Sequence, residues 1–207
     1  MKTIVIVLMI ALFAAPAAAD WTLTVTEARS SGGVDGFVVQ SAEPGYPTEE
    51  LFIAADGGMM RVYETRELGE PWDPMAEEVF LVPATTITAG MTWNFLPDET
   101  SAYQAEAIQM ESVSTPAGTF DAWLVDITEV GGSGYFTSSM WWVDGVGLLG
   151  ESEFEGGWLT WESKLASYTA NGSGFLPLAI GNSWTFQSAE VDTEAGSIGA
   201  IKARFGN

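Results

Sequence analysis

The chain has 207 residues, with 28 acidic and 7 basic side chains, a net charge of −21, and neither cysteine nor histidine. This composition excludes disulfide scaffolds, thiol nucleophiles, Ser-His-Asp catalysis and histidine-based zinc sites. The acidic balance argues against nucleic acid and anionic membrane surfaces as partners, because like charges repel. No G-x-x-x-x-G-K-[ST] phosphate loop is present, and we expect no cofactor.

Residues 1–19 have the three parts of an export signal. Lys2 supplies a positive charge, residues 4–13 are uniformly apolar, and small residues end at Ala17 and Ala19 before Asp20. The apolar run is too short to span a bilayer, so we expect cleavage before Asp20 and no stable membrane insertion afterwards. The sequence thus predicts a periplasmic or secreted protein, and the lack of cysteine is typical of a bacterial envelope protein.

The first third of the mature chain predicts short strands. Residues 21–26 alternate large apolar side chains with threonine, the period of a half-buried strand. Residues 51–54 and 59–63 flank Asp56-Gly57-Gly58 and predict a hairpin with a glycine turn. Residues 78–82 and 91–95 predict two further strands, and residues 71–77 are expected to form at most one helical turn.

The middle of the chain predicts longer strands. Residues 103–114 and 120–130 flank Thr115-Pro116-Ala117-Gly118-Thr119, in which proline sets the turn and glycine supplies a positive φ. In the second of these strands, Trp123, Val125 and Ile127 are predicted to share one face.

Three more strands are predicted over residues 135–143, 148–154 and 158–168, separated by glycine turns. The adjacent Trp141 and Trp142 must point to opposite faces of their strand. Leu159, Trp161 and Leu165 are predicted to share a face.

Regular turns between short alternating runs predict an all-β fold, an antiparallel meander that forms a curved sheet, half-barrel or sandwich. Residues 20–207 are expected to form a single β domain. Residues 169–174 resemble a linker. Residues 175–207 either close the sheet with a strand pair or begin a truncated repeat, and the first reading is favoured because so few residues bury little core.

A short phrase recurs along the chain. Residues 90–95 read Gly-Met-Thr-Trp-Asn-Phe and residues 181–186 read Gly-Asn-Ser-Trp-Thr-Phe, and residues 21–23 repeat its Trp-Thr-apolar part. This pattern fits either a turn-into-strand phrase that is used more than once or the duplication of a half-sheet.

Three phrases carry a resemblance to a known group of proteins. They are F-L-P-L-A-I-G-N-S-W-T-F at residues 175–186, V-S-T-P-A-G-T-F-D-A-W at residues 113–123 and W-W-V-D-G-V-G-L-L-G-E at residues 141–151. Together they resemble uncharacterised bacterial exported β-rich proteins with FPL-x-x-G-N-x-W, P-A-G-T-F-D and W-x-x-G-V-G-L phrases. The resemblance implies an envelope location and a twisted antiparallel sheet, and it implies no functional residue. Here the opening phrase lies near the C-terminus, unlike the usual order.

Tryptophan carries the first functional hypothesis, an exported non-catalytic envelope or secreted protein with a binding or structural role. Trp142, Trp158 and Trp161 lie on predicted strands and would offer flat platforms to a glycan, a lipid or a protein ligand. The competing interpretation is that each tryptophan simply fills the core.

Two alternatives remain. A hydrophobic-ligand or lipid carrier would curl the sheet around an apolar cavity. A carboxylate-based glycan hydrolase would need two acids at a defined separation, and six acids lie on or beside the tryptophan-bearing strands: Asp121, Asp126, Asp144, Glu151, Glu153 and Glu162. No catalytic residue is assigned. No metal ligand is assigned either, because the densest acidic stretch, residues 64–78, lacks the spacing of a calcium loop.

Overall fold

The computed structural model describes residues 20–96, 102–130 and 136–190, which form strands and turns and no helix. The predicted signal peptide, residues 1–19, lies outside this part of the chain. No membrane-spanning helix is found in the described residues. The strands are β1 (Asp20–Ser31), β2 (Val34–Ala42), β3 (Glu49–Asp56), β4 (Met59–Glu67), β5 (Asp73–Pro83), β6 (Thr92–Leu96), β7 (Ala102–Thr115), β8 (Gly118–Val130), β9 (Phe136–Val143), β10 (Gly147–Glu155), β11 (Trp158–Thr169) and β12 (Ser183–Glu190).

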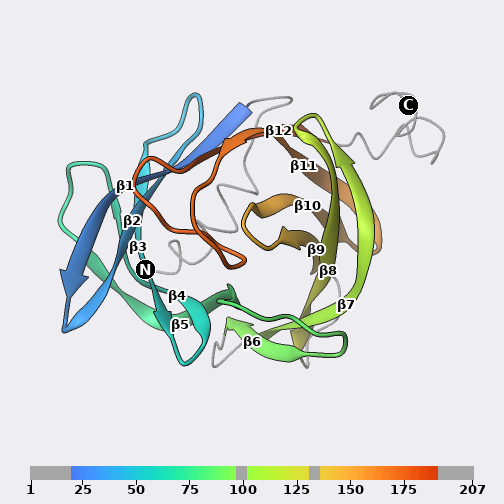
Figure 1. Cartoon of the computed structure of the whole chain (residues 1–207), viewed down its shortest axis with the longest axis horizontal. Coiled ribbons are helices and arrows are strands. Elements are labelled where there is room, and N and C mark those ends of the chain that lie inside the picture. Colours follow the sequence, from blue (N-terminus) through green and yellow to red (C-terminus); the bar gives the residue numbers. More distant parts are fainter. Residues whose placement is uncertain (1–19, 97–101, 131–135, 191–207) are drawn as a thin grey trace.

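All twelve strands belong to one antiparallel sheet, which confirms the predicted all-β meander. The strand order is β5-β4-β3-β2-β1-β12-β11-β10-β9-β8-β7-β6, so β12 lies in the middle and joins the two ends of the chain. Figure 1 shows that the sheet curls until its two halves face each other across a common interior. The edge strands β5 and β6 share no ladder, but the Trp93 indole of β6 donates a hydrogen bond of 3.2 Å to the Phe80 carbonyl of β5.

The period-two alternation sets which side chains fill that interior. Val125 and Ile127 of β8 are buried in the common core, as their shared face predicted. Trp142 is buried, whereas Trp141 lies on the other side of β9, where its indole donates to Glu111 of β7 at 2.7 Å. Burying one large apolar side chain contributes roughly 1.5–3 kcal/mol, so these alternating positions stabilise the curled form of the sheet.

The expected helical turn over residues 71–77 is wrong, because β5 already begins at Asp73. Asp73 and Pro74 pair with Thr65 and Glu64 of β4. Without β5, strand β4 would be the edge of the sheet, and its backbone N–H and C=O groups on that side would be unpaired. Residues 73–83 pair with these groups instead of forming a helical turn. A proline fits there because an edge strand has one side without ladder bonds.

The two halves of the sheet repeat the same irregularities. One half consists of β12 followed by β1–β5, and the other of β6–β11, with the strands equivalent in that order. The pairing of β1 with β2 skips Thr26, and the equivalent pairing of β7 with β8 skips Ile108. The pairing of β3 with β4 skips Tyr63, and the pairing of β9 with β10 skips Leu149. Bulges are specific local features, so their recurrence at equivalent places favours a duplicated six-stranded unit.

The recurring glycine phrase has the same backbone role in both halves. Gly90, with φ of 77°, donates to the Ala107 carbonyl, and Gly181, with φ of 89°, donates to the Val25 carbonyl. These positive φ values explain why both positions hold glycine. The tryptophan three residues later is buried in each case, at Trp93 and at Trp184.

A segment without strands, residues 170–182, connects β11 to β12 and contains the predicted linker except for Thr169, which ends β11. Figure 1 shows it in orange, running across the space that the sheet encloses. Asn182 is fully buried and fixes the segment, since its amide donates to the carbonyls of Asn171 (3.0 Å) and Pro177 (2.7 Å). Phe175 is buried in the core, and Gly174 donates to Asp144 at the end of β9.

A smaller cluster lies on the outer face of β1–β4. Phe52 points away from the interior, because its neighbours Leu51 and Ile53 line it, yet Phe52 is also fully buried. The guanidinium of Arg29 lies over the Phe52 ring at 4.9 Å and over the Trp72 ring at 4.0 Å. The outer face of this half therefore gathers basic and aromatic side chains.

Candidate functional site

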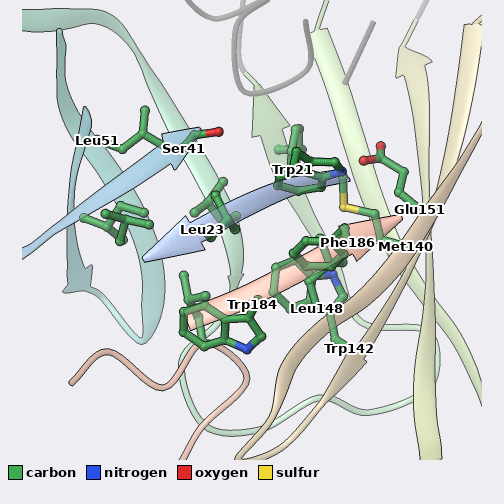
Figure 2. Close-up of a pocket in the computed structure, with 15 residues that line it drawn as sticks. Trp21, Leu23, Ser41, Leu51, Met140, Trp142, Leu148, Glu151, Trp184 and Phe186 are labelled. Carbon is green, nitrogen blue, oxygen red and sulfur yellow. The ribbon is translucent and has the colours of Figure 1, made fainter. Parts of the chain in front are cut away.

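The interior of the curled sheet contains a cavity of about 70 Å³. A single water needs roughly 10–15 Å³ of such volume, so several non-hydrogen atoms fit. Figure 2 shows side chains from both halves of the sheet converging on it. The lining residues are Trp21, Leu23, Val39, Ser41, Leu51, Ile53, Leu81, Phe95, Met140, Trp142, Leu148, Glu151, Leu176, Trp184 and Phe186.

The wall is almost entirely apolar and in part aromatic. Trp21 stacks on Phe186 with ring centroids 4.2 Å apart and an interplanar angle of 13°. The Trp184 indole is anchored by a 2.5 Å hydrogen bond to the Val146 carbonyl. Packed rings with fixed orientation make a preformed apolar site.

Glu151 is the one ionisable side chain among the described residues that line the cavity. It lies on β10, paired with Met140 of β9 and Ser163 of β11, and none of its surface is exposed. The Ser138 hydroxyl donates to its Oε1 at 2.5 Å, whereas its Oε2 has no hydrogen-bond partner among the described residues. Burial raises the pKa of Glu151, and the Ser138 hydrogen bond opposes that rise.

Glu153 lies two residues further along β10 and therefore on the same face. It is paired with Ser138 and Trp161, and 1% of its surface is exposed. Burial raises its pKa, and the neighbouring Glu151 and Glu155 carboxylates raise it further. Its Oε1 finds no hydrogen-bond partner in the described structure.

The strand registers place further unpartnered polar groups around these two acids. Ser163 faces Glu151 across β10 and β11, and Ser188 faces Ser163 across β11 and β12. Their hydroxyls and the indole nitrogen of Trp161 have no hydrogen-bond partner within the described residues. We call Glu151, Glu153, Trp161, Ser163 and Ser188 the carboxyl patch. Buried polar groups are normally paired, so this patch has hydrogen-bonding capacity that no group of the described residues takes up.

The repeated half provides an internal comparison for the patch. The registers make Thr65 equivalent to Glu151, since Thr65 pairs with Leu51 as Glu151 pairs with Met140. By the same alignment Glu67 is equivalent to Glu153, but Glu67 is exposed. The half that contains β1–β5 thus forms the same strand arrangement without a buried carboxyl group at either of these two positions, so the arrangement itself does not require them.

The tryptophans predicted to bind a ligand have different surroundings. Trp142 lines the cavity, and Trp161 belongs to the carboxyl patch, both 5% exposed. Trp158 lies at the start of β11 and is 63% exposed, away from the cavity. Two of the three therefore converge on the interior, and neither is an open platform. Their role in binding stays a prediction.

Of the six acids considered for hydrolysis, only Glu151 and Glu153 come together inside the fold. Asp126 accepts a hydrogen bond from Ser139 at 2.7 Å, and Asp121 is exposed. Asp144 accepts from the Gly174 backbone, and Glu162 lies 3.2 Å from the Lys164 ammonium. No group of three or more metal-binding side chains occurs among the described residues.

Sequence reasoning missed most of the cavity wall. It did not select Trp21, Trp184 or Phe186, although all three belong to the recurring tryptophan phrase. It also did not separate Glu151 and Glu153 from the other acids. The sequence distinguishes these two acids only by their i, i+2 spacing, which puts both on one face of β10. They pair with Met140 and Ser138 of β9.

Comparison of the chain with protein-family models, with curated proteins and with solved structures gave no significant match. The fold and the site therefore define the protein's class by themselves. It is a curled twelve-stranded antiparallel sheet whose apolar cavity contains a buried carboxyl group, with a second carboxyl group beside it.

Proposed function

We propose that the chain is an exported, non-catalytic binding protein that holds a small, mainly apolar molecule in the cavity of its sheet. The observation that carries this proposal is the cavity itself, whose wall is apolar apart from Ser41 and Glu151. Each CH₂ group that a ligand buries there contributes roughly 0.8 kcal/mol. The export signal predicted at residues 1–19 and the strongly acidic composition support a role in the envelope or outside the cell.

The test is a tryptophan fluorescence titration of the purified protein with linear alcohols of increasing chain length. Trp21, Trp142 and Trp184 line the cavity, so an occupant changes their emission. The variant Trp158→Phe removes the most exposed described tryptophan and sharpens the signal. We expect a saturable response whose affinity rises about three- to fourfold per added CH₂, as its transfer free energy requires.

A cavity-filling variant is the matched control. Ser41 lines the cavity from β2, and Ser41→Leu places apolar volume inside it. Ser139→Leu adds the same volume on β9, where Ser139 bonds Asp126 outside the cavity wall. We expect only the first variant to weaken binding. A flat response of the unmodified protein to every alcohol would refute the proposed function.

The pair Glu151 and Glu153 also favours a second candidate, the carboxylate-based glycan hydrolase. Such enzymes place two carboxyl groups about 5–10 Å apart, one of them with a raised pKa. Against this candidate, at most 1% of either residue is exposed, which leaves no open cleft for a sugar chain. Hydrolysis of aryl glycosides that Glu151→Gln abolishes would establish it.

A further inference from the structure

We propose that the cavity selects apolar molecules that carry a protonated amine, and that Glu151 and Glu153 bind the ammonium group. This inference rests on the proposed function and specifies the chemistry of its ligand. Such a ligand would contact the apolar wall with its hydrocarbon part and the carboxyl patch with its ammonium group.

The first step is the position of the free acceptors. Oε2 of Glu151 and Oε1 of Glu153 have no hydrogen-bond partner among the described residues, and both side chains project from the same face of β10. Glu151 lines the cavity directly, and Figure 2 shows its carboxylate near Met140, its neighbour on β9. An ammonium group has three N–H donors and no acceptor, so it complements such a set of oxygens.

The second step is charge. No basic side chain of the described residues lines the cavity. The four described basic residues form ion pairs elsewhere: Arg29 with Glu64, Arg61 with Asp56, Arg66 with Glu50 and Lys164 with Glu162. An ionised Glu151 or Glu153 therefore has no cationic partner within the described fold. Buried charges are paired in stable proteins, and a cationic ligand would supply the missing partner.

The third step is the comparison within the chain. The equivalent positions of the other half are a buried threonine, Thr65, and an exposed glutamate, Glu67. Burying a carboxyl group costs free energy. Since the same strand arrangement forms with a threonine, the cost at Glu151 is not needed for folding and points to recognition.

The fourth step separates an amine from other polar ligands. A calcium ion takes six to eight oxygen ligands, and no group of three or more metal-binding side chains exists among the described residues. A fatty acid would bring a third carboxyl group to two others. The Trp161 indole and the Ser163 hydroxyl, both unpartnered, can instead donate to the carboxylates once an ammonium group has ionised them.

The test compares three probes of equal chain length, butylamine, butanol and butanoic acid, which match the size of the cavity, by the same fluorescence titration. We work in about 1 M salt, where the Debye length is about 3 Å and the acidic surface attracts amines little. We expect butylamine to bind at least about tenfold more tightly than butanol, and butanoic acid to bind most weakly. At neutral pH in weak buffer, butylamine binding should release protons from the carboxyl pair.

The variants Glu151→Gln and Glu153→Gln should reduce the preference for butylamine over butanol to about twofold or less, with butanol affinity retained. Glu151→Thr is a second variant. It places at position 151 the residue type found at the equivalent position, Thr65, where threonine is buried in the same strand arrangement. Glu162→Gln is the control, since Glu162 pairs with Lys164 outside the cavity. It should keep the preference.

The outcomes separate the two proposals. If butanol or butanoic acid binds as tightly as butylamine, or if the glutamine variants keep the preference, the amine inference is overturned while the proposed function stands. If none of the three probes binds to the unmodified protein, the proposed function fails and the inference fails with it.

Discussion

At the scale of single residues, the buried acids of β10 are the most unusual feature of the molecule. Glu151 and Glu153 are almost fully buried, and Glu151 accepts a hydrogen bond from the Ser138 hydroxyl. Both have raised pKa values, chiefly because burial penalises the charged form. The folded protein therefore binds more protons than the unfolded chain in the window above the ordinary glutamate pKa, and stability must decrease as pH rises through that window.

This linkage gives a prediction for the unliganded protein. The free energy of unfolding should fall as pH rises above about 4.5, the ordinary value, and level off once both acids are ionised. Glu49, whose pKa is raised to about 7 by burial and by Glu67, contributes to the same trend. In Glu151→Gln the fall should be smaller, which urea denaturation at a series of pH values measures. The control Glu162→Gln should follow the unmodified protein, and parallel curves for all three would contradict the assignment.

At the scale of elements, the two glycine-to-strand phrases should behave alike. Gly90 and Gly181 have positive φ values and lead into β6 and β12. A Cβ at either position meets no atom within 4 Å, so the cost of substitution comes from backbone strain alone. We expect Gly90→Ala and Gly181→Ala to destabilise the protein by about 1–2 kcal/mol each.

Chemical denaturation measures both losses. Asn94→Ala and Thr185→Ala, at equivalent positions of the strands that follow, are the controls and should cost much less, since Asn94 is exposed and Thr185 half-buried. A large loss at one glycine and none at the other would argue that the two phrases are not structural repeats.

At the scale of the whole molecule, the curled sheet depends on how its two edges meet. β5 and β6 share no backbone ladder, and the Trp93 indole bonds the Phe80 carbonyl between them. We expect Trp93→Phe to cost about 0.5–1.5 kcal/mol for the lost hydrogen bond. Amide hydrogen exchange should accelerate in β5 and β6 before it does in the central strands.

Trp141→Phe is the matched control for that experiment. It removes a similar indole hydrogen bond, to Glu111, on the outer face and between interior strands of the sheet. Its stability loss should be comparable while exchange at β5 and β6 is unchanged. Equal acceleration in both variants would mean that the Trp93 contact does not hold the edges together.

Much of this fold could be predicted from the sequence because strand signals are local. The turn at Asp56-Gly57-Gly58 separates β3 from β4, and the alternation in residues 120–130 gave the buried face of β8. The helical turn expected over residues 71–77 failed because pairing with β4 outweighs a weak local preference. The domain boundaries, the export signal and the family resemblance stay predictions.

The sequence by itself determined the all-β class, the hairpins and which side chains share a face, because a strand alternates with a period of two. Only the tertiary structure decided that β12 lies between β1 and β11, which brings Trp21 onto Phe186. It also decided that Trp142 and Trp161 are enclosed and that Glu151 and Glu153 are buried together. Alternation cannot tell the inner face of a curled sheet from the outer one, since that depends on strands distant in the chain.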